Sequence, residues 1–249
     1  MKNYLILLIL LFLCHNVSAQ KTGEEKLGSW YMFSGIHRIS NKLSINSGAQ
    51  IRDYETTSNF QQLLLLTGVS YNVNSNLTTS IGYGYLNTDK SFEELIDETN
   101  TEEHRLFQQV SLKNKLWKLK FEHRYRLEER FLDYNNRNNT QLRTRYRMQV
   151  TLPITDIFSI GVYDEVFLNL QGDVFSQNRL FAALGIKVSQ NSKVQLGYLK
   201  NNLNNIVFNR LQLGLFIQTD LRNKNENQYV HNVSKGSNEN KKRSDLLTD

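Results

Sequence analysis

Charged side chains at every second position mark residues 117–130, which read WKLKFEHRYRLEER. One parity of this segment is ionic and carries three arginines, two lysines and two glutamates. A row of guanidinium groups produces a positive field and can hold carboxylate or phosphate through paired hydrogen bonds. Glutamates in the same row neutralise the arginines instead. The segment therefore predicts either a site for an anion or a packed interior of ion pairs, and the interleaved Glu122 and Glu128 favour the packed interior.

The same ionic parity recurs in later and earlier segments, and its members are predicted to share one interior. The interior charged network that we expect comprises Arg105, Lys118, Lys120, Glu122, Arg124, Arg126, Glu128, Arg130, Arg143, Arg145, Arg147, Glu165, Arg179 and Arg210.

The opposite parity of residues 117–130 is mostly apolar and includes Leu119, Phe121, Tyr125 and Leu127. A period of two indicates a β-strand with two different faces. Fourteen residues exceed the usual five or six of a soluble strand and suffice for a tilted strand that crosses a bilayer. Charges are costly against lipid and tolerated in a barrel lumen. We therefore expect a transmembrane strand with its ionic face in the lumen.

The alternation extends from about residue 28 to residue 219 and predicts the fold class. We expect an all-β protein, an antiparallel up-and-down transmembrane β-barrel of about 10–12 strands with a charged interior. Residues 28–38 alternate poorly, and counting them as a strand gives eleven, whereas bacterial single-chain barrels use even numbers. We expect that segment to be split, to lie partly inside the barrel, or to pair with a further strand.

The connections are predicted to alternate in length, as they do in outer-membrane barrels. The short turns are expected near residues 40–41, 74–75, 114–115, 153–156 and 190–192. The longer loops are expected at residues 53–59, 87–102, 132–139, 170–176 and 201–206.

The chain divides into four predicted regions. Residues 1–19 have the basic start, apolar run and small residues of a signal peptide, with cleavage expected after Ala19 in preference to lipidation at Cys14. Residues 20–27 form a short lead, and 28–219 form the barrel. Residues 220–249 are polar and predict a disordered tail. The signal peptide and the strands together predict the bacterial outer membrane.

Composition excludes several classes of site. Cys14 is the only cysteine, so the processed chain has no disulfide, thiolate nucleophile or cysteine zinc site. His37, His104, His123 and His231 have no metal-ligand spacing, and we predict neither a metal nor another cofactor. The net charge of +6 does not predict nucleic-acid binding, because the basic residues alternate along strands instead of clustering. The acidic loop at residues 88–103 is expected to be solvated.

Several strings resemble a bacterial family known as domain of unknown function 2490 (DUF2490). They are residues 103–109 (EHRLFQQ), 123–131 (HRYRLEERF), 143–147 (RTRYR) leading to Pro153, 163–167 (YDEVF) and 177–180 (QNRL). The resemblance covers roughly residues 28–219. It implies an outer-membrane β-barrel-like protein of Bacteroidetes-type, Gram-negative bacteria, and it implies no activity.

The expected function is that of an outer-membrane barrel without a catalytic role, serving a structural purpose or the binding or passage of a small anionic solute. There are two alternatives: an outer-membrane enzyme that acts on lipid, and a soluble periplasmic ligand-binding barrel. The lipid-acting enzyme requires a nucleophile and a base grouped at one rim. The expected partners are outer-membrane lipid and the barrel-assembly machinery, with no nucleic acid, and the protein is expected to be a monomer.

Overall fold

The alternating segments form eleven β-strands in the computed structural model, which describes residues 23–93, 100–134, 137–203 and 206–222. The strands are β1 (Leu27–Arg38), β2 (Leu43–Asp53), β3 (Phe60–Asn72), β4 (Leu77–Thr88), β5 (Thr101–Leu116), β6 (Leu119–Tyr134), β7 (Arg137–Pro153), β8 (Phe158–Asn169), β9 (Phe175–Lys187), β10 (Ser192–Leu203) and β11 (Ile206–Asp220). The described residues include no helix long and apolar enough to span a membrane. The predicted signal peptide, residues 20–22 of the predicted lead and most of the predicted tail lie outside the described residues.

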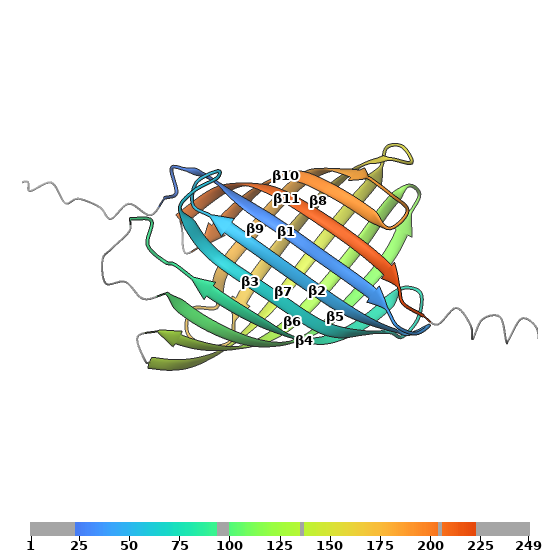
Figure 1. Cartoon of the computed structure of the whole chain (residues 1–249). Helices are drawn as coiled ribbons and strands as arrows, with labels where there is room; N and C mark the ends of the chain where they lie inside the picture. Colours follow the sequence, from blue (N-terminus) through green and yellow to red (C-terminus); the bar gives the residue numbers. More distant parts are fainter. Residues whose placement is uncertain (1–22, 94–99, 135–136, 204–205, 223–249) are drawn as a thin grey trace, which may run out of the picture.

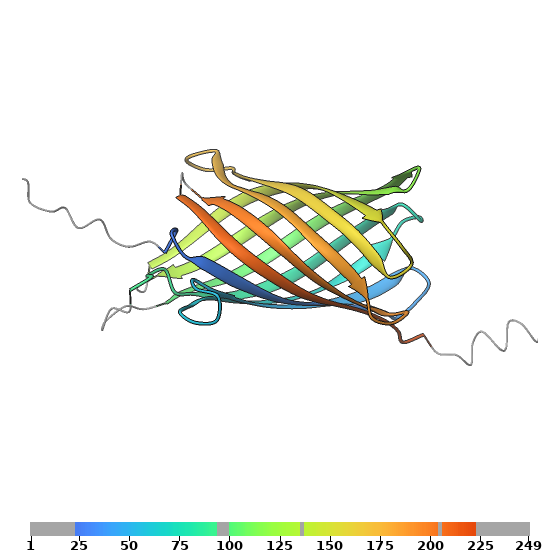
Figure 2. The same cartoon turned by 90° about the horizontal axis from the view of Figure 1, so that it is seen from above.

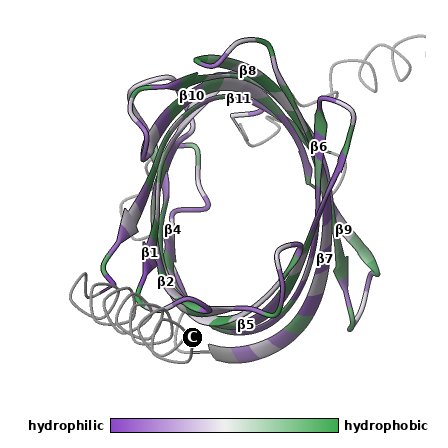
Figure 3. Cartoon of the chain, turned by 90° about the vertical axis from the view of Figure 1, so that its right-hand side faces the viewer, coloured by the Kyte–Doolittle hydropathy of each residue, from purple (hydrophilic) through white to green (hydrophobic). Residues whose placement is uncertain are grey.

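The strands close into one barrel, as Figures 1 and 3 show. Each strand pairs antiparallel with the next along the chain, which confirms the predicted all-β barrel. The closing pair is different: β1 and β11 are parallel, in register from Leu27 beside Asn209 to Arg38 beside Asp220. Hairpins reverse the chain at each step, so an odd number of strands leaves the first and last pointing the same way. The prediction of a wholly antiparallel barrel is wrong at this pair, which we call the seam.

Residues 28–38, expected to be irregular, lie within the full-length strand β1. The prediction failed because β1 carries large apolar residues on its inward parity, Trp30 and Met32 among them, which hides the alternation. Because the strand count is odd, β1 begins at one end of the barrel and β11 finishes at the other (Figures 1 and 2). The longer connections, such as residues 54–59 and the described residues 89–93 after β4, lie at the end where β1 begins.

Several connections differ from the predicted ones. The β5–β6 hairpin turns at Trp117, which has a positive φ of 55°, and Lys118, three residues beyond the predicted turn at 114–115. The predicted long loop at 132–139 is largely taken up by strands, because β6 runs to Tyr134 and β7 starts at Arg137. Strands β10 and β11 likewise occupy most of the predicted loop at 201–206.

Three of the short turns are built in the same way, by a polar side chain that accepts two backbone N–H groups. Ser40 Oγ accepts from Lys42 and Leu43 at 3.2 and 2.9 Å. Asn74 Oδ1 accepts from the backbone N–H groups of Asn76 and Leu77, both at 2.8 Å. Thr155 Oγ1 likewise accepts from the backbone N–H groups of Ile157 and Phe158. Such side-chain bonds fix a turn locally. They define the end of the barrel at which β1 and β11 finish.

The two faces of the barrel wall are inverted relative to those of a soluble protein. Outward side chains such as Ile81 and Leu196 are 65% and 58% exposed, whereas Arg210 is 1% exposed and Glu128 is fully buried. Figure 3 shows the underlying alternation of hydrophilic and hydrophobic residues along the strands. Asp164 is a charged exception on the outward face, where it accepts a hydrogen bond from Asn178 Nδ2. The wall therefore places ions inside and hydrocarbon outside.

Small residues on the inward parity make room for large ones on the neighbouring strand. Gly82 of β4 lies opposite Phe107 of β5, and a Cβ at Gly82 would overlap the Phe107 ring and the Thr67 carbonyl oxygen. The Phe107 ring in turn supports the Arg126 guanidinium, which lies 4.3 Å from its centroid. Gly82 thus fixes the position of part of the charged interior.

We predict that Gly82→Ala lowers the free energy of unfolding by about 1–3 kcal/mol, the usual cost of forced overpacking. Gly48→Ala is the matched control, because a Cβ there makes only an ordinary contact with Leu66 Cβ at 3.4 Å. Urea titration of the folded protein in lipid vesicles measures both. Equal stability of the two variants would contradict the packing role assigned to Gly82.

Candidate interior charge site

Glu128 is the centre of the charged interior. Its carboxylate is fully buried and lies among four arginines from three adjacent strands. Arg143 donates to Oε2 through Nε and Nη2 at 2.9 and 2.6 Å, and Arg145 donates to Oε1 at 2.7 Å. Arg105 and Arg126 lie farther away, at 3.5 and 3.7 Å. This surplus of donors holds the buried carboxylate in its ionised form.

Arg145 connects Glu128 to a second buried carboxylate, Glu165 of β8. The Arg145 Nη2 and Nε groups donate to Glu165 Oε1 at 2.8 and 3.2 Å. Arg124 Nη2 donates to the same oxygen at 2.5 Å, and Arg179 Nη1 lies 3.8 Å from Oε2. Arginines from β6, β7 and β9 therefore converge on one glutamate.

A third carboxylate extends the chain of ion pairs toward the long-loop end. Arg130 forms a two-pronged pair with Glu103, at 2.8 Å to each oxygen. Arg105 donates to Glu103 Oε1 through Nε at 2.8 Å and also lies beside Glu128. Ion pairs thus run without a break from Glu103 to Glu165 across β5–β8. Glu122 and Arg147 form a separate pair, with Arg147 Nη2 donating to Glu122 Oε1 at 3.2 Å.

Aromatic rings supply the remaining contacts of the arginines. Phe167 is almost fully buried, and the guanidinium groups of Arg145 and Arg179 lie 4.3 and 4.5 Å from its centroid. Trp30 lies between Arg52 at 4.0 Å and Arg179 at 4.8 Å. A cation over an aromatic face is stabilised by the ring's quadrupole. These rings therefore pack among the guanidinium groups of the interior.

The structure brings most of the predicted residues together. Glu122, Glu128 and Glu165 meet the predicted arginines of β5, β6, β7 and β9 as described. Arg210 lies apart: it is buried near the seam, where Nη1 donates to the Asn209 carbonyl oxygen at 3.1 Å and the guanidinium lies 4.8 Å from the Phe208 ring. The described part of the chain provides no carboxylate partner for it.

Two predicted lysines do not join the network. The prediction that Lys118 is an interior residue is wrong, because the β5–β6 hairpin turns there and places its Nζ over the exposed Trp117 ring at 5.4 Å. Lys120 keeps the inward parity but lies at the short-turn rim, opposite Lys115, and is exposed. The error arose because the strand begins at Leu119 instead of at Trp117.

Two members of the interior were missed. Glu103 was assigned to the acidic loop at 88–103, but it is the third residue of β5 and is buried. Arg52 lies on the inward parity of β2 and bonds to Gln50 and Gln62. Both residues lie near the end of a strand and keep its inward parity. Continuing the alternation strictly to the strand ends would have identified them.

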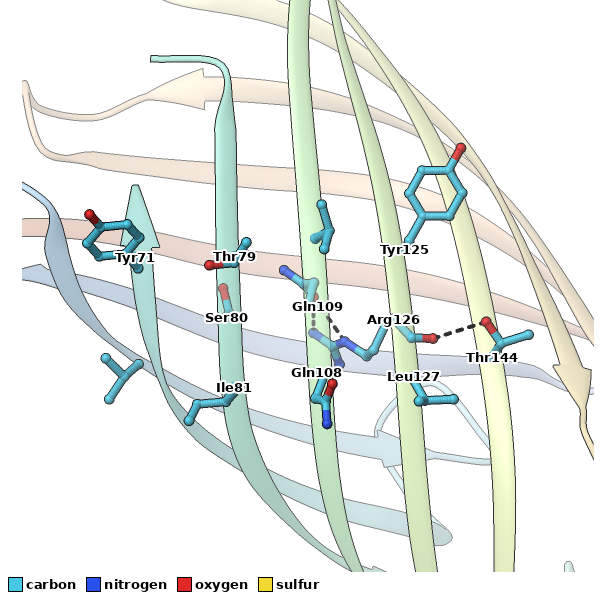
Figure 4. A pocket seen from close by; sticks show the side chains of 12 residues that line it. Tyr71, Thr79, Ser80, Ile81, Gln108, Gln109, Tyr125, Arg126, Leu127 and Thr144 are labelled. Carbon is cyan, nitrogen blue, oxygen red and sulfur yellow. Dashed lines mark hydrogen bonds between the residues drawn. The ribbon is translucent and has the colours of Figure 1, made fainter. Parts of the chain in front are cut away.

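The outer wall has a shallow hollow of about 620 Å³ across β3–β7, shown in Figure 4. Its side chains are those of Val69, Tyr71, Thr79, Ser80, Ile81, Gln108, Gln109, Val110, Tyr125, Arg126, Leu127 and Thr144. Arg126 bonds to Gln109 Oε1 at 2.9 and 2.6 Å, so its charge stays on the inner side. These residues include no carboxylate or imidazole, so the hollow has no acid–base pair for chemistry.

The described histidines all point outward and have hydroxyl partners. His123 Nδ1 lies 2.9 Å from the Tyr146 hydroxyl, and His104 bonds to the Tyr83 hydroxyl. His37 lies between two hydroxyls, those of Ser47 and Thr219. Among the described residues, no group of three or more histidine, cysteine or acidic side chains has the geometry of a metal site.

Fold and interior together define a closed β-barrel with a buried network of arginine and glutamate. The family model described as Protein of unknown function (DUF2490) matches residues 27–212, and the chain belongs to this family. The match confirms the resemblance found in the sequence. No curated protein and no solved structure matches the chain.

We predict that Glu128→Gln lowers the free energy of unfolding by about 3–5 kcal/mol, because it leaves several buried arginines without their counter-charge. Glu122→Gln is the control. That carboxylate is 29% exposed and has one arginine partner, so its loss should cost less than about 1 kcal/mol. Urea titration of both variants in vesicles gives the comparison, and similar costs would show that the network does not stabilise the barrel.

Proposed function

We propose that the protein is a bacterial outer-membrane β-barrel whose lumen is closed by the arginine–glutamate network and serves a structural role. The observation that carries this proposal is the inverted wall, in which Glu128 and Arg210 are buried while large hydrophobic side chains cover the outside. Such a surface is unfavourable in water and suited to lipid. It argues against the alternative of a soluble periplasmic barrel.

The dimensions of the strands support the same environment. A strand of twelve residues, such as β4, rises roughly 30 Å if each residue advances about 3.3 Å and the strand tilts by about 40°. The hydrocarbon core of a bilayer is about 30 Å thick. Outer-membrane lipid and the machinery that assembles barrels are therefore the partners we propose.

A second role, the binding of a small anion, is favoured by the charges at the short-turn mouth of the lumen. Lys115 lies directly opposite Lys120, and Lys187 lies opposite Lys193, all on the inward parity. Like charges in directly opposed positions repel each other, and an anion between them would relieve the repulsion. The buried network below closes the path, so we propose binding at the mouth without passage.

The first prediction concerns location. The protein should separate with the outer membrane in a sucrose gradient and should lack residues 1–19. The signal sequence and the hydrocarbon outer wall are the reasons. N-terminal sequencing and a heat-modifiable band on gels provide the measurements. A soluble periplasmic product would overturn the proposal.

The second prediction concerns conductance. Purified protein in planar bilayers should give no stable channel, or only a very small one, because ion pairs and aromatic rings fill the middle of the lumen. The control is Glu128→Gln combined with Arg145→Gln, which removes the ion pair at the centre of the network and should raise conductance if the double variant folds. Large, stable, anion-selective openings in the unaltered protein would favour a pore instead.

A further inference from the structure

A serine and a histidine meet on the outer wall at the short-turn end of the seam. His37 of β1 lies between Ser47 of β2 and Thr219 of β11, and all three side chains point outward. His37 Nε2 is 2.9 Å from Ser47 Oγ, and His37 Nδ1 is 2.8 Å from Thr219 Oγ1. If Thr219 accepts the Nδ1 proton, Nε2 is left to accept the proton of Ser47. A nucleophile, a base and a group that orients the base are thus in hydrogen-bond reach of one another.

The backbone leaves room for this meeting at one residue. Gly35 of β1 lies directly opposite Ser47, between His37 and the rest of the wall. A Cβ at Gly35 would overlap both Ser47 Oγ and His37 Nε2. Any other residue at this position would separate the serine from the histidine. The absence of a side chain at Gly35 is therefore part of the site.

An apolar groove of about 380 Å³ lies on the same outer face, and neither Ser47 nor His37 lines it. It is lined by Tyr31, Met32, Phe33, Ala49, Ile51, Val194, Leu213, Gly214 and Leu215. Phe33 and Ala49, which line the groove, are the outward pair next to Gly35 and Ser47 in the β1–β2 register, so one step along the two strands separates the groove from the serine.

We propose that Ser47 and His37 hydrolyse the acyl esters of membrane glycerolipids, with the acyl chain in this groove. The proposal rests on membrane insertion of the barrel, and it replaces the expectation of no catalytic role. His37 and Thr219 are one residue from the ends of their strands, and Ser47 is four residues into β2. This depth is that of the boundary between headgroups and hydrocarbon, where the ester bonds of lipids lie. The groove then takes the hydrocarbon that extends deeper.

The reaction balances with water as the only co-reactant. Ser47 Oγ attacks the ester carbonyl carbon while its proton passes to His37 Nε2. The tetrahedral adduct collapses, the bond from the carbonyl carbon to the glycerol oxygen breaks, and His37 returns the proton to that oxygen. Water, deprotonated by His37, then attacks the carbonyl carbon of the acyl-serine. The bond from that carbon to Ser47 Oγ breaks, His37 returns the proton to Oγ, and a fatty acid is released. Thr219 is a positioning residue, because it touches only the imidazole.

The test uses the full-length protein, folded in vesicles of phosphatidylethanolamine and phosphatidylglycerol, and measures released fatty acid. We expect hydrolysis, with losses of at least about a hundredfold in Ser47→Ala and in His37→Gln. Gly35→Ala should also abolish activity while both reactive side chains remain. His123→Gln is the matched control, since it removes an outward histidine with a hydroxyl partner elsewhere on the wall.

Thr219 has a separate readout. Thr219→Val should lower kcat and displace the acid limb of the pH profile, because the imidazole loses its Nδ1 partner, and Thr219→Ser should restore both. A purely structural role for Thr219 would change stability without moving the pH profile.

A second measurement covers variants that fail to fold. A fluorophosphonate should label the unaltered protein at Ser47, as located by mass spectrometry. Absence of both labelling and hydrolysis in correctly inserted protein overturns this inference and leaves the proposed barrel function intact. Hydrolysis that persists in folded Ser47→Ala overturns it as well. A protein that does not enter the outer membrane but is labelled at Ser47 by a short-chain ester analogue would retain the serine site and remove the membrane proposal.

Discussion

The desolvation of Glu128 is the constraint on which the rest of the barrel depends. A fully buried carboxylate is strongly destabilising unless several donors surround it. Its four arginines come from β5, β6 and β7, so they meet it only if these strands pair in the observed register. A slip of one residue in one of these strands would turn that strand's charges toward the outside. The outer face alone would fix the register less strictly, because its aliphatic side chains have no directional partners. The ion pairs therefore specify the alignment of the wall.

The odd number of strands has consequences at the seam. In a parallel pair the same ends of two strands lie side by side, so the end of β11 lies beside the end of β1. This arrangement places Thr219 next to His37. If β1 and β11 were antiparallel, the two residues would lie at opposite ends of the barrel. On the inner side, β1 contributes Trp30, whose ring fills the space between Arg52 and Arg179. The strand that alternates least clearly therefore closes the barrel and contributes to both faces.

Parity was predictable from the sequence, whereas register was not. The alternation identified the inward faces of β6 and β7 and nearly all the residues of the charged network, since side chains on a strand strictly alternate. It could not show which arginine meets which glutamate, because pairing depends on where each hairpin turns. The turn at Trp117 and Lys118 illustrates this: an error of three residues moved Lys118 from the predicted interior to the surface. Glu103 and Arg52 were missed where the alternation runs into a loop. His37 and Ser47 share the outward parity and are joined by one hairpin, but only the register shows that both lie beside Gly35.

The difference between the two faces also explains the chemistry available on each. Inside, arginines from neighbouring strands compensate the charge of a buried carboxylate, so ion pairs are stable there. Outside, a side chain that faces lipid has few partners, and an ionised group is costly. Asp164, on that face, relies on a hydrogen bond from Asn178. A histidine oriented by a neutral hydroxyl, as His37 is by Thr219, avoids placing a further charge against hydrocarbon. The seam therefore brings a serine and a histidine together on an otherwise apolar face, without a carboxylate beside them, while the ion pairs inside hold the strands in register.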